Sequence, residues 1–222
     1  MLTDGKCKRT SCEAMQSAQR FYDLWEWCGG HDGAAERALL EQAYGDPART
    51  YHNWTHIDAM LDLLDGVRNA GEFADVELPE VELAIFFHDV VYDPKASDNE
   101  QRSADILRDM SAGIDVGLIA NVCSMILATE KHRPSTDAST KLLLDLDLAV
   151  LGAAPAEYDA YVTGVRQEYS FLPDEKWNAG RKKVLERFLE RPVVYQTSHF
   201  RHLLEQNARQ NILREISSIP VS

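Results

Sequence analysis

Three observations predict an all-α fold, a single bundle of about ten helices. Apolar residues recur at three- and four-residue spacing along almost every segment, which is typical of one face of an α-helix. No strand pattern stands out, because the only β-like run, 193–195, is very short. No Pro/Gly/Ser-rich linker interrupts the 222 residues, so we expect one domain over 13–222 after a partly disordered leader over 1–12.

The first three helices are expected over about 12–28, over about 32–44, and from near Asn53 to Gly71. Gly71 ends the third helix, because glycine readily adopts the left-handed conformation that closes a helix. The apolar stripe of this helix follows the expected spacing and comprises Ile57, Met60, Leu61, Leu64 and Val67.

The fourth helix begins at Pro79, a residue favoured in a first turn, and is expected to continue to Val91. The fifth begins after Ser97 or Asp98, either of which can cap it, and ends at Gly113. Asp115 caps the sixth. The buried stripe of the sixth helix is expected to comprise Leu118, Ile119, Val122, Met125 and Ile126, and to extend through Thr129 to His132.

Four more helices are expected at 137–151, 155–171, 173–190 and 198–216. Gly152 ends the first of these, as glycine commonly ends a helix. The helices from 155 to 217 carry no candidate chemistry in sequence. We interpret them as packing helices, with a homodimer face as one option.

Composition limits the classes of partner. A net charge of −13 argues against binding to nucleic acid or to an anionic membrane, since both need a cationic surface. No apolar run approaches the roughly 18 residues of a membrane helix, and the first residues lack the apolar core of a signal peptide. We therefore expect a cytoplasmic protein. The four cysteines match no zinc-site template and are expected to be reduced thiols.

The pair His88-Asp89 directly follows the apolar run 81–87. A carboxylate at the buried end of a helix costs several kcal/mol unless it has a partner, and a divalent cation is a common partner for histidine with aspartate. His56 lies upstream on another expected helix. Imidazole and carboxylate ligands without thiolate suit zinc, manganese, iron or, less well, magnesium.

The segment LLLDLDLAVLG offers two candidates for a fourth ligand, Asp145 and Asp147. On a helix they point roughly 200° apart, so they cannot both face one ion. Lys141 lies one turn before Asp145. The residues one turn away from Asp147 are all apolar: Leu143, Leu144, Val150 and Leu151. We therefore favour Asp147 as the ligand on the buried face. Asp145 is expected either to contact the ligands without binding the metal or to lie on the surface.

The ordered set of His56, His88-Asp89 and Asp147, all on expected helices, resembles the HD superfamily of metal-dependent phosphohydrolases. The likeness covers about residues 44–152 and implies an HD-type helical domain. A bacterial family of small predicted HD-type phosphohydrolases is similar over more of the chain. The segments that carry this similarity are RTYHNWTH, FFHDVVYDP, DNEQRSA, ATEKH, LDLDLAVLG and ARQNILREI.

The stretch YHNWTHIDAM also resembles the HN-x-x-H-x-x-D signature of cyclic nucleotide phosphodiesterases, a branch of the same superfamily. Carried over by position, this resemblance implies that His56 is a metal ligand and that His52 protonates the leaving oxygen. The glutamine that grips the purine in that branch is not found. We therefore expect hydrolysis of a phosphoester, of a nucleotide or a small phosphorylated metabolite, by water that a divalent metal activates.

Further residues suit supporting roles in such a reaction. Asn53 is a candidate either to bind a ligand or to close the start of its helix, and Glu100 to act as general base or to orient the water. Charged and polar donors near the motifs are candidates to hold the phosphate. These donors are Arg49, Lys131, His132 and Asn99.

Two other functions stay open. A di-iron HD-type oxygenase needs additional histidines, for which His132 and His52 are available. A non-catalytic HD module that binds a nucleotide needs no intact ligand set. The sequence leaves open the substrate, the metal and the number of ions.

Overall fold

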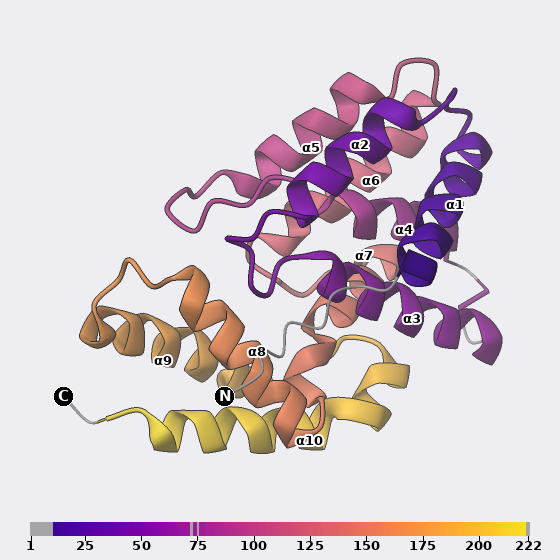
Figure 1. The fold of residues 1–222 in the computed structure, drawn as a ribbon. Helices are drawn as coiled ribbons and strands as arrows, with labels where there is room; N and C mark the ends of the chain where they lie inside the picture. The colour runs from indigo at the N-terminus through magenta and orange to yellow at the C-terminus, as the bar shows by residue number, and fades with distance from the viewer. Residues whose placement is uncertain (1–10, 72, 75, 221–222) are drawn as a thin grey trace.

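The helical spacing of the apolar residues yields an all-α bundle in the computed structural model, which describes residues 11–71, 73–74 and 76–220 (Figure 1). Over this part of the chain there are ten α-helices, one short 3-10 helix (η1) and no strand, as the sequence predicts. The helices are α1 Ser11–Trp27, α2 Ala34–Tyr44, α3 Trp54–Ala70, α4 Leu78–Phe87, α5 Asn99–Met110, α6 Val116–Thr129, α7 Ala138–Asp147, η1 Leu148–Gly152, α8 Pro155–Glu168, α9 Asp174–Glu190 and α10 Ser198–Ser218.

The expected leader falls mainly on residues 1–10, which lie outside the described residues. Its last two positions, 11 and 12, belong to α1. The helix expected over 12–28 therefore begins one position earlier than predicted.

Helix α4 is the core of the bundle. Every residue from Val81 to Phe87 is buried, and α4 packs against α1, α3, α5, α6 and α7. A helix that is apolar all round is stable only when neighbours cover all its faces. The one acid in the run, Glu82, is paired with Arg20 and Arg68. This burial places the end of α4, with His88, deep inside the protein.

Helix α4 ends at Phe87, so the prediction that it continues to Val91 is wrong. The chain turns there instead, and the Arg49 guanidinium stabilises the turn. It donates to the backbone carbonyls of Asp89 and Val90, at 2.6 and 3.0 Å. His88 consequently caps the helix, and Asp89 lies in the turn.

The helix expected over 137–151 is two elements, because α7 ends at Asp147 and η1 follows. The Tyr195 hydroxyl donates to the carbonyl of Leu148 at 3.1 Å and so stabilises η1 at its start. Gly152 closes η1 against α10, where an added Cβ would lie 2.8 Å from the Leu204 carbonyl. Similarly, α8 ends at Glu168 and not at 171.

The three C-terminal helices, α8, α9 and α10, gather on one side of the bundle, in the lower part of Figure 1. Helix α10 packs along η1 and α9. A buried ion pair joins α9 to α10, with Arg181 Nε 2.8 Å from Glu215 Oε1, and the Tyr158 hydroxyl of α8 donates to the same carboxylate. These polar contacts fix the packing of the three helices.

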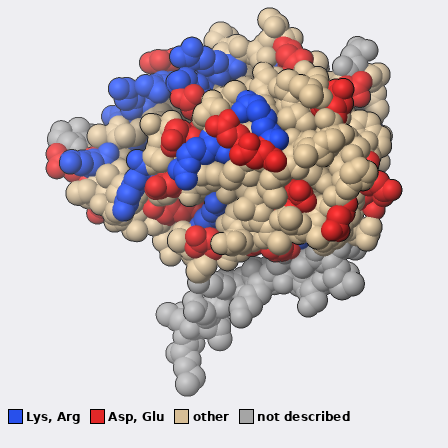
Figure 2. Space-filling model, turned by 90° about the horizontal axis from the view of Figure 1, so that it is seen from above, with Lys and Arg blue, Asp and Glu red and all other residues tan. Residues whose placement is uncertain are grey.

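The surface carries mixed charge. Figure 2 shows a face on which Lys and Arg side chains gather toward one side, where they lie among Asp and Glu side chains. Within the described ranges, no helix has the length and apolar character needed to cross a membrane.

Candidate metal centre

Three side chains from three helices meet at one point: His56 in the first turn of α3, His88 at the end of α4 and Asp147 at the end of α7. Their ligand atoms all lie within 4.8 Å of one another. His56 Nε2 is 3.3 Å from His88 Nε2 and 3.2 Å from Asp147 Oδ1. Two imidazole nitrogens and a carboxylate oxygen at such spacing form a donor set that suits a divalent transition metal.

Asp89 brings a second carboxylate to the same point. Its Oδ2 lies 3.2 Å from His88 Nε2 and 3.9 Å from His56 Nε2. The structure thus brings together all four side chains that the sequence nominates as ligands. The turn after α4 makes this possible, because it directs two consecutive side chains to one side.

A backbone hydrogen bond fixes the orientation of the His88 ring. Its Nδ1 lies 2.9 Å from the carbonyl oxygen of Ile85, which accepts a hydrogen bond from it. The proton on Nδ1 leaves Nε2 as the atom that faces the cluster. Metal-binding histidines are commonly held in this way by a backbone carbonyl.

The cluster retains negative charge. Burial disfavours the charged form of His88, but Asp89 and Asp147 outweigh this and raise the pKa of His88 to about 9. Burial likewise works against ionisation of Asp89, yet His88 holds the pKa of Asp89 below its ordinary value. The pKa of Asp147 is also lowered against burial, chiefly by hydrogen bonds from His132 and His56. The two carboxylates thus favour positive charge at His88, and a divalent cation would take the place of the proton that they hold there.

Asp145 points away from the cluster, and its expected place behind the ligands or on the surface is wrong. It is completely buried. Its carboxylate accepts the backbone N–H groups of Gln196 and Thr197, and the Thr197 hydroxyl, each at 2.7 Å. Asp147 is the more exposed of the two aspartates, with 16% of its side chain accessible. Asp145 therefore ties α7 to the start of α10.

Glu168 is the functional candidate that sequence reasoning missed. This buried last residue of α8 accepts a hydrogen bond from His52 Nδ1 at 2.7 Å. Its other oxygen accepts the backbone N–H groups of Tyr51 and His52, at 2.7 and 3.0 Å. The Tyr92 ring stacks on His52 with centroids 4.1 Å apart. His52 lies before the start of α3, in a turn, and is held on three sides.

The remaining residues of this turn have structural partners. Asn53 caps α3, because its side chain accepts the Thr55 N–H at 2.9 Å and donates to the Arg49 carbonyl at 3.0 Å. Of the two roles expected for Asn53, the structure therefore has it closing the helix start. Arg49 holds the carbonyls of the turn after α4, as described above, so its guanidinium positions Asp89.

His132 lies beyond the end of α6, which corrects its expected place on the helical stripe. Its backbone is left-handed, with φ 46°. This turn brings its Nε2 to 2.7 Å from Asp147 Oδ2, the oxygen that faces away from His56. Glu100 is half-buried in the first turn of α5. Burial and the nearby charges of Asp89 and Glu130 raise its pKa.

A cavity of about 480 Å³ opens beside the cluster. Its polar end is formed by His52, His132 and Asp147, and its other walls come mainly from α8 and α9. A concave site of this size next to a donor cluster is the usual setting of a small-molecule site.

No protein-family model, curated protein or solved structure matches this chain. The likeness to the HD superfamily therefore rests on the motif residues alone.

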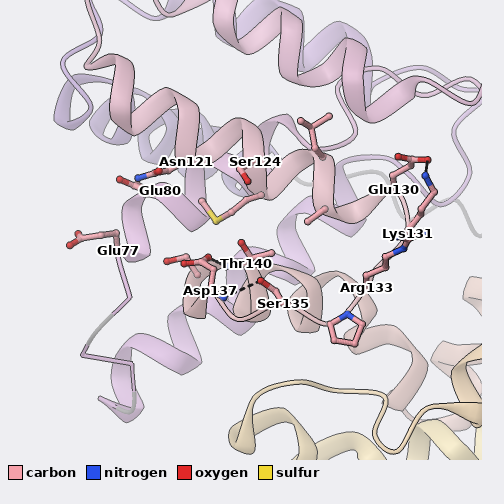
Figure 3. A pocket seen from close by; sticks show the side chains of 15 residues that line it. Glu77, Glu80, Asn121, Ser124, Glu130, Lys131, Arg133, Ser135, Asp137 and Thr140 are labelled. Atoms are coloured by element: carbon pink, nitrogen blue, oxygen red, sulfur yellow. Dashed lines mark hydrogen bonds and ion pairs between the residues drawn. The ribbon is translucent and has the colours of Figure 1, made fainter.

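Two of the expected phosphate-binding residues lie elsewhere. Lys131 pairs with Glu130 at 2.5 Å and lines a second cavity of about 570 Å³ (Figure 3). In that cavity Glu77 and Glu80 lie at one end and Lys131 at the other. None of the four clustered ligands lines it. Asn99 accepts the Asp93 N–H at 3.0 Å and donates to the Asp93 carbonyl at 2.9 Å, so it closes the loop before α5.

Proposed function

We propose that the protein is a metal-dependent phosphohydrolase, which cleaves a phosphoester of a nucleotide or a small phosphorylated metabolite. The observation that carries the proposal is the meeting of His56, His88 and Asp147, with ligand atoms within 4.8 Å of one another. Asp89 beside them supplies a second carboxylate. The residues fit a divalent ion, because the hydrogen bond from His88 Nδ1 to Ile85 leaves Nε2 for the metal. The ordered motif that resembles the HD superfamily supports the same class.

Bound there, a divalent ion supplies Lewis-acid polarisation of a phosphoryl oxygen and activation of water. His52 is the proposed proton donor to the leaving oxygen. Its Nδ1 is engaged by Glu168, and its ring lines the cavity, so Nε2 is the atom left to donate. Burial disfavours a charged His52, but the bond to Glu168 prevails and raises its pKa, which favours the form that can donate.

Two further residues have proposed roles at the same place. His132 lies at 2.7 Å from Asp147 Oδ2 and also lines the cavity, so it orients that ligand and offers its ring edge to a phosphate. Glu100, with a raised pKa, is the proposed base or water-orienting group.

The test is metal content measured together with hydrolysis. The native protein, His88→Ala and Asp147→Ala are purified, and metal per chain is measured by mass spectrometry. Phosphate release is then followed over nucleotides and phosphorylated metabolites with added manganese, zinc, magnesium or iron. His202→Ala is the control, because this histidine is exposed on α10. We expect metal and turnover in the native and control proteins, and a large loss of both in the two ligand variants.

Other results would point to other functions. Absence of metal and of turnover with every added ion would overturn the proposal and favour a non-catalytic module that binds a nucleotide. Two irons per chain with a visible absorption band would favour the oxygenase. The proximity of His132 to Asp147 is a feature that a second iron could use.

A further inference from the structure

The cavity beside the metal centre has a polar end and an aromatic end. His52, His132 and Asp147 form the polar end. Asp147 is the only acid among the described residues that line the cavity. Tyr51 and Tyr92 lie beside His52 at this end. Away from it the walls are apolar, with the aromatic rings of Tyr161, Tyr169 and Trp177 among aliphatic side chains. Such a wall favours a flat, apolar group over a polyhydroxylated one.

Trp177 is the aromatic residue that is best placed for stacking. It is half-buried, and the Tyr169 ring lies beside it with centroids 5.3 Å apart. The Arg166 guanidinium lies 5.5 Å from the Trp177 ring and is itself bonded to the carbonyls of Tyr169 and Leu172. These contacts hold the indole in place while part of it remains open to the cavity. A ring fixed in this way binds a planar partner at low cost in conformational entropy.

The cations near this end differ in availability. Arg181 lines the cavity, but it is committed to Glu215 at 2.8 Å and to the Tyr161 hydroxyl at 2.9 Å. Lys176 is exposed at the rim. The buried end thus offers aromatic surface without a carboxylate, while positive charge is available only toward solvent.

The cavity has free space beside Gly180 of α9. A Cβ built at this lining residue would meet no atom within 4 Å. A larger side chain there would project into open space without a backbone clash. Gly66, on α3, has the same open surroundings and does not line the cavity. The two glycines therefore form a matched pair for testing the use of this space.

We propose that the cavity selects a phosphoester whose organic part carries a planar aromatic ring, with the phosphate at His132 and the ring against Trp177 and Tyr169. The inference rests on the proposed function and specifies its substrate class. Nucleobases and simple aryl groups share the required chemistry. Open-chain phosphorylated polyols do not.

The test compares AMP, phenyl phosphate and glycerol 2-phosphate as substrates of the native protein, Trp177→Ala, Trp177→Phe, Gly180→Leu and Gly66→Leu. We expect the KM for the two aromatic esters to rise about tenfold or more in Trp177→Ala and Gly180→Leu, because stacking of one base is typically worth this much. Gly66→Leu should stay near the native values, and Trp177→Phe, which keeps a smaller ring, should give KM values between those of the native protein and Trp177→Ala. The KM for glycerol 2-phosphate should change little in any variant.

Binding of adenosine, measured by calorimetry, separates this inference from the proposed function, because it needs neither metal nor turnover. Adenosine binding that is lost in Trp177→Ala, in a protein that hydrolyses nothing, would support the aromatic site and reject the enzyme. Hydrolysis of all three esters with equal KM, unaffected by Trp177→Ala and Gly180→Leu, would overturn the aromatic site and keep the enzyme. Failure of adenosine and AMP to bind at all would also overturn it.

Discussion

The Glu168 carboxylate binds both the side chain and the backbone of His52. One carboxylate oxygen accepts His52 Nδ1 at 2.7 Å, and the other accepts the N–H of the same residue at 3.0 Å. The two residues are 116 positions apart in the chain. A helix that carries no motif thus positions the turn before α3, and the proposed proton donor depends on it.

Replacement of Glu168 by Gln should therefore reduce turnover without removing metal. Glutamine keeps the shape of the side chain but loses the charge that favours protonated His52. We expect kcat for phosphoester hydrolysis to fall by about 10²-fold, the usual contribution of a general acid. Metal per chain should be unchanged. Glu157→Gln, at the exposed start of the same helix, is the control. A native kcat in Glu168→Gln would show that His52 needs no carboxylate partner.

The same pair should make stability depend on pH. Burial opposes ionisation of Glu168, but bonds from His52 and the Tyr51 backbone lower its pKa below the ordinary 4.5. The pKa of His52 is raised above the ordinary 6.5. The stabilisation by Glu168 is full above 4.5 and is lost as pH falls through its lowered pKa. The stabilisation by His52 is full below 6.5 and is lost as pH rises through its raised pKa.

We therefore expect the free energy of unfolding of the native protein to be higher than that of Glu168→Gln, with the largest difference between pH 4.5 and 6.5. Urea unfolding of both proteins with a metal chelator present, at a series of pH values, measures this difference. A difference that is constant with pH would contradict the charged pairing of the two residues.

The two aspartates of α7 should separate stability from metal binding. In Asp145→Asn, the new amide would face N–H donors of Gln196 or Thr197, so we expect a loss of about 2 kcal/mol or more in free energy of unfolding. Asp147→Asn should lose most of its metal and, with a chelator present, less stability than Asp145→Asn, because Asp147 is partly exposed and Asp145 is completely buried. Urea unfolding and metal content measure the two effects. The reverse assignment would follow if Asp145→Asn lost metal while its stability stayed native.

The buried ion pair between α9 and α10 should show strong coupling. Glu215→Ala leaves the Arg181 cation buried without its carboxylate and removes the partner of the Tyr158 hydroxyl. We expect a loss of about 3–5 kcal/mol for this change, as when one partner of a buried pair is removed. The double variant Arg181→Met with Glu215→Leu should be more stable than Glu215→Ala, because no charge remains unpaired. A double-mutant cycle by urea unfolding tests this, and additive effects would contradict it.

Local sequence was sufficient to predict the helices but not all of their ends. Apolar spacing located each of them, because each buries one face or, for α4, all faces. The predicted ends of α4 and α7 were wrong, and at both points a side chain distant in sequence, Arg49 or Tyr195, bonds backbone carbonyls of the segment that follows the helix. Such tertiary hydrogen bonds leave no trace in the periodicity of a single segment.

The sequence was sufficient to predict which side chains form the cluster, but not how deeply each of them is buried. Asp147 lies in the cluster as expected, but the argument that it is the more buried aspartate was wrong, since the segment at 196–197 covers Asp145. Glu168 did leave a signal. A carboxylate at the last position of a helix opposes the helix dipole, and such a residue requires a positive or N–H partner elsewhere.

Asp145, which bonds the start of α10, and Asp147, which faces the cluster, are two residues apart on α7. Because they lie on one helix, the two side chains move together. The connection between α9 and α10 is thus a poor place for an engineered insertion or a circular permutation. Lengthening it would strain the hydrogen bonds to Asp145 and shift the Asp147 carboxylate out of the cluster. Loops whose hydrogen bonds are local, such as the one between α5 and α6, offer a safer location for labels and fusions.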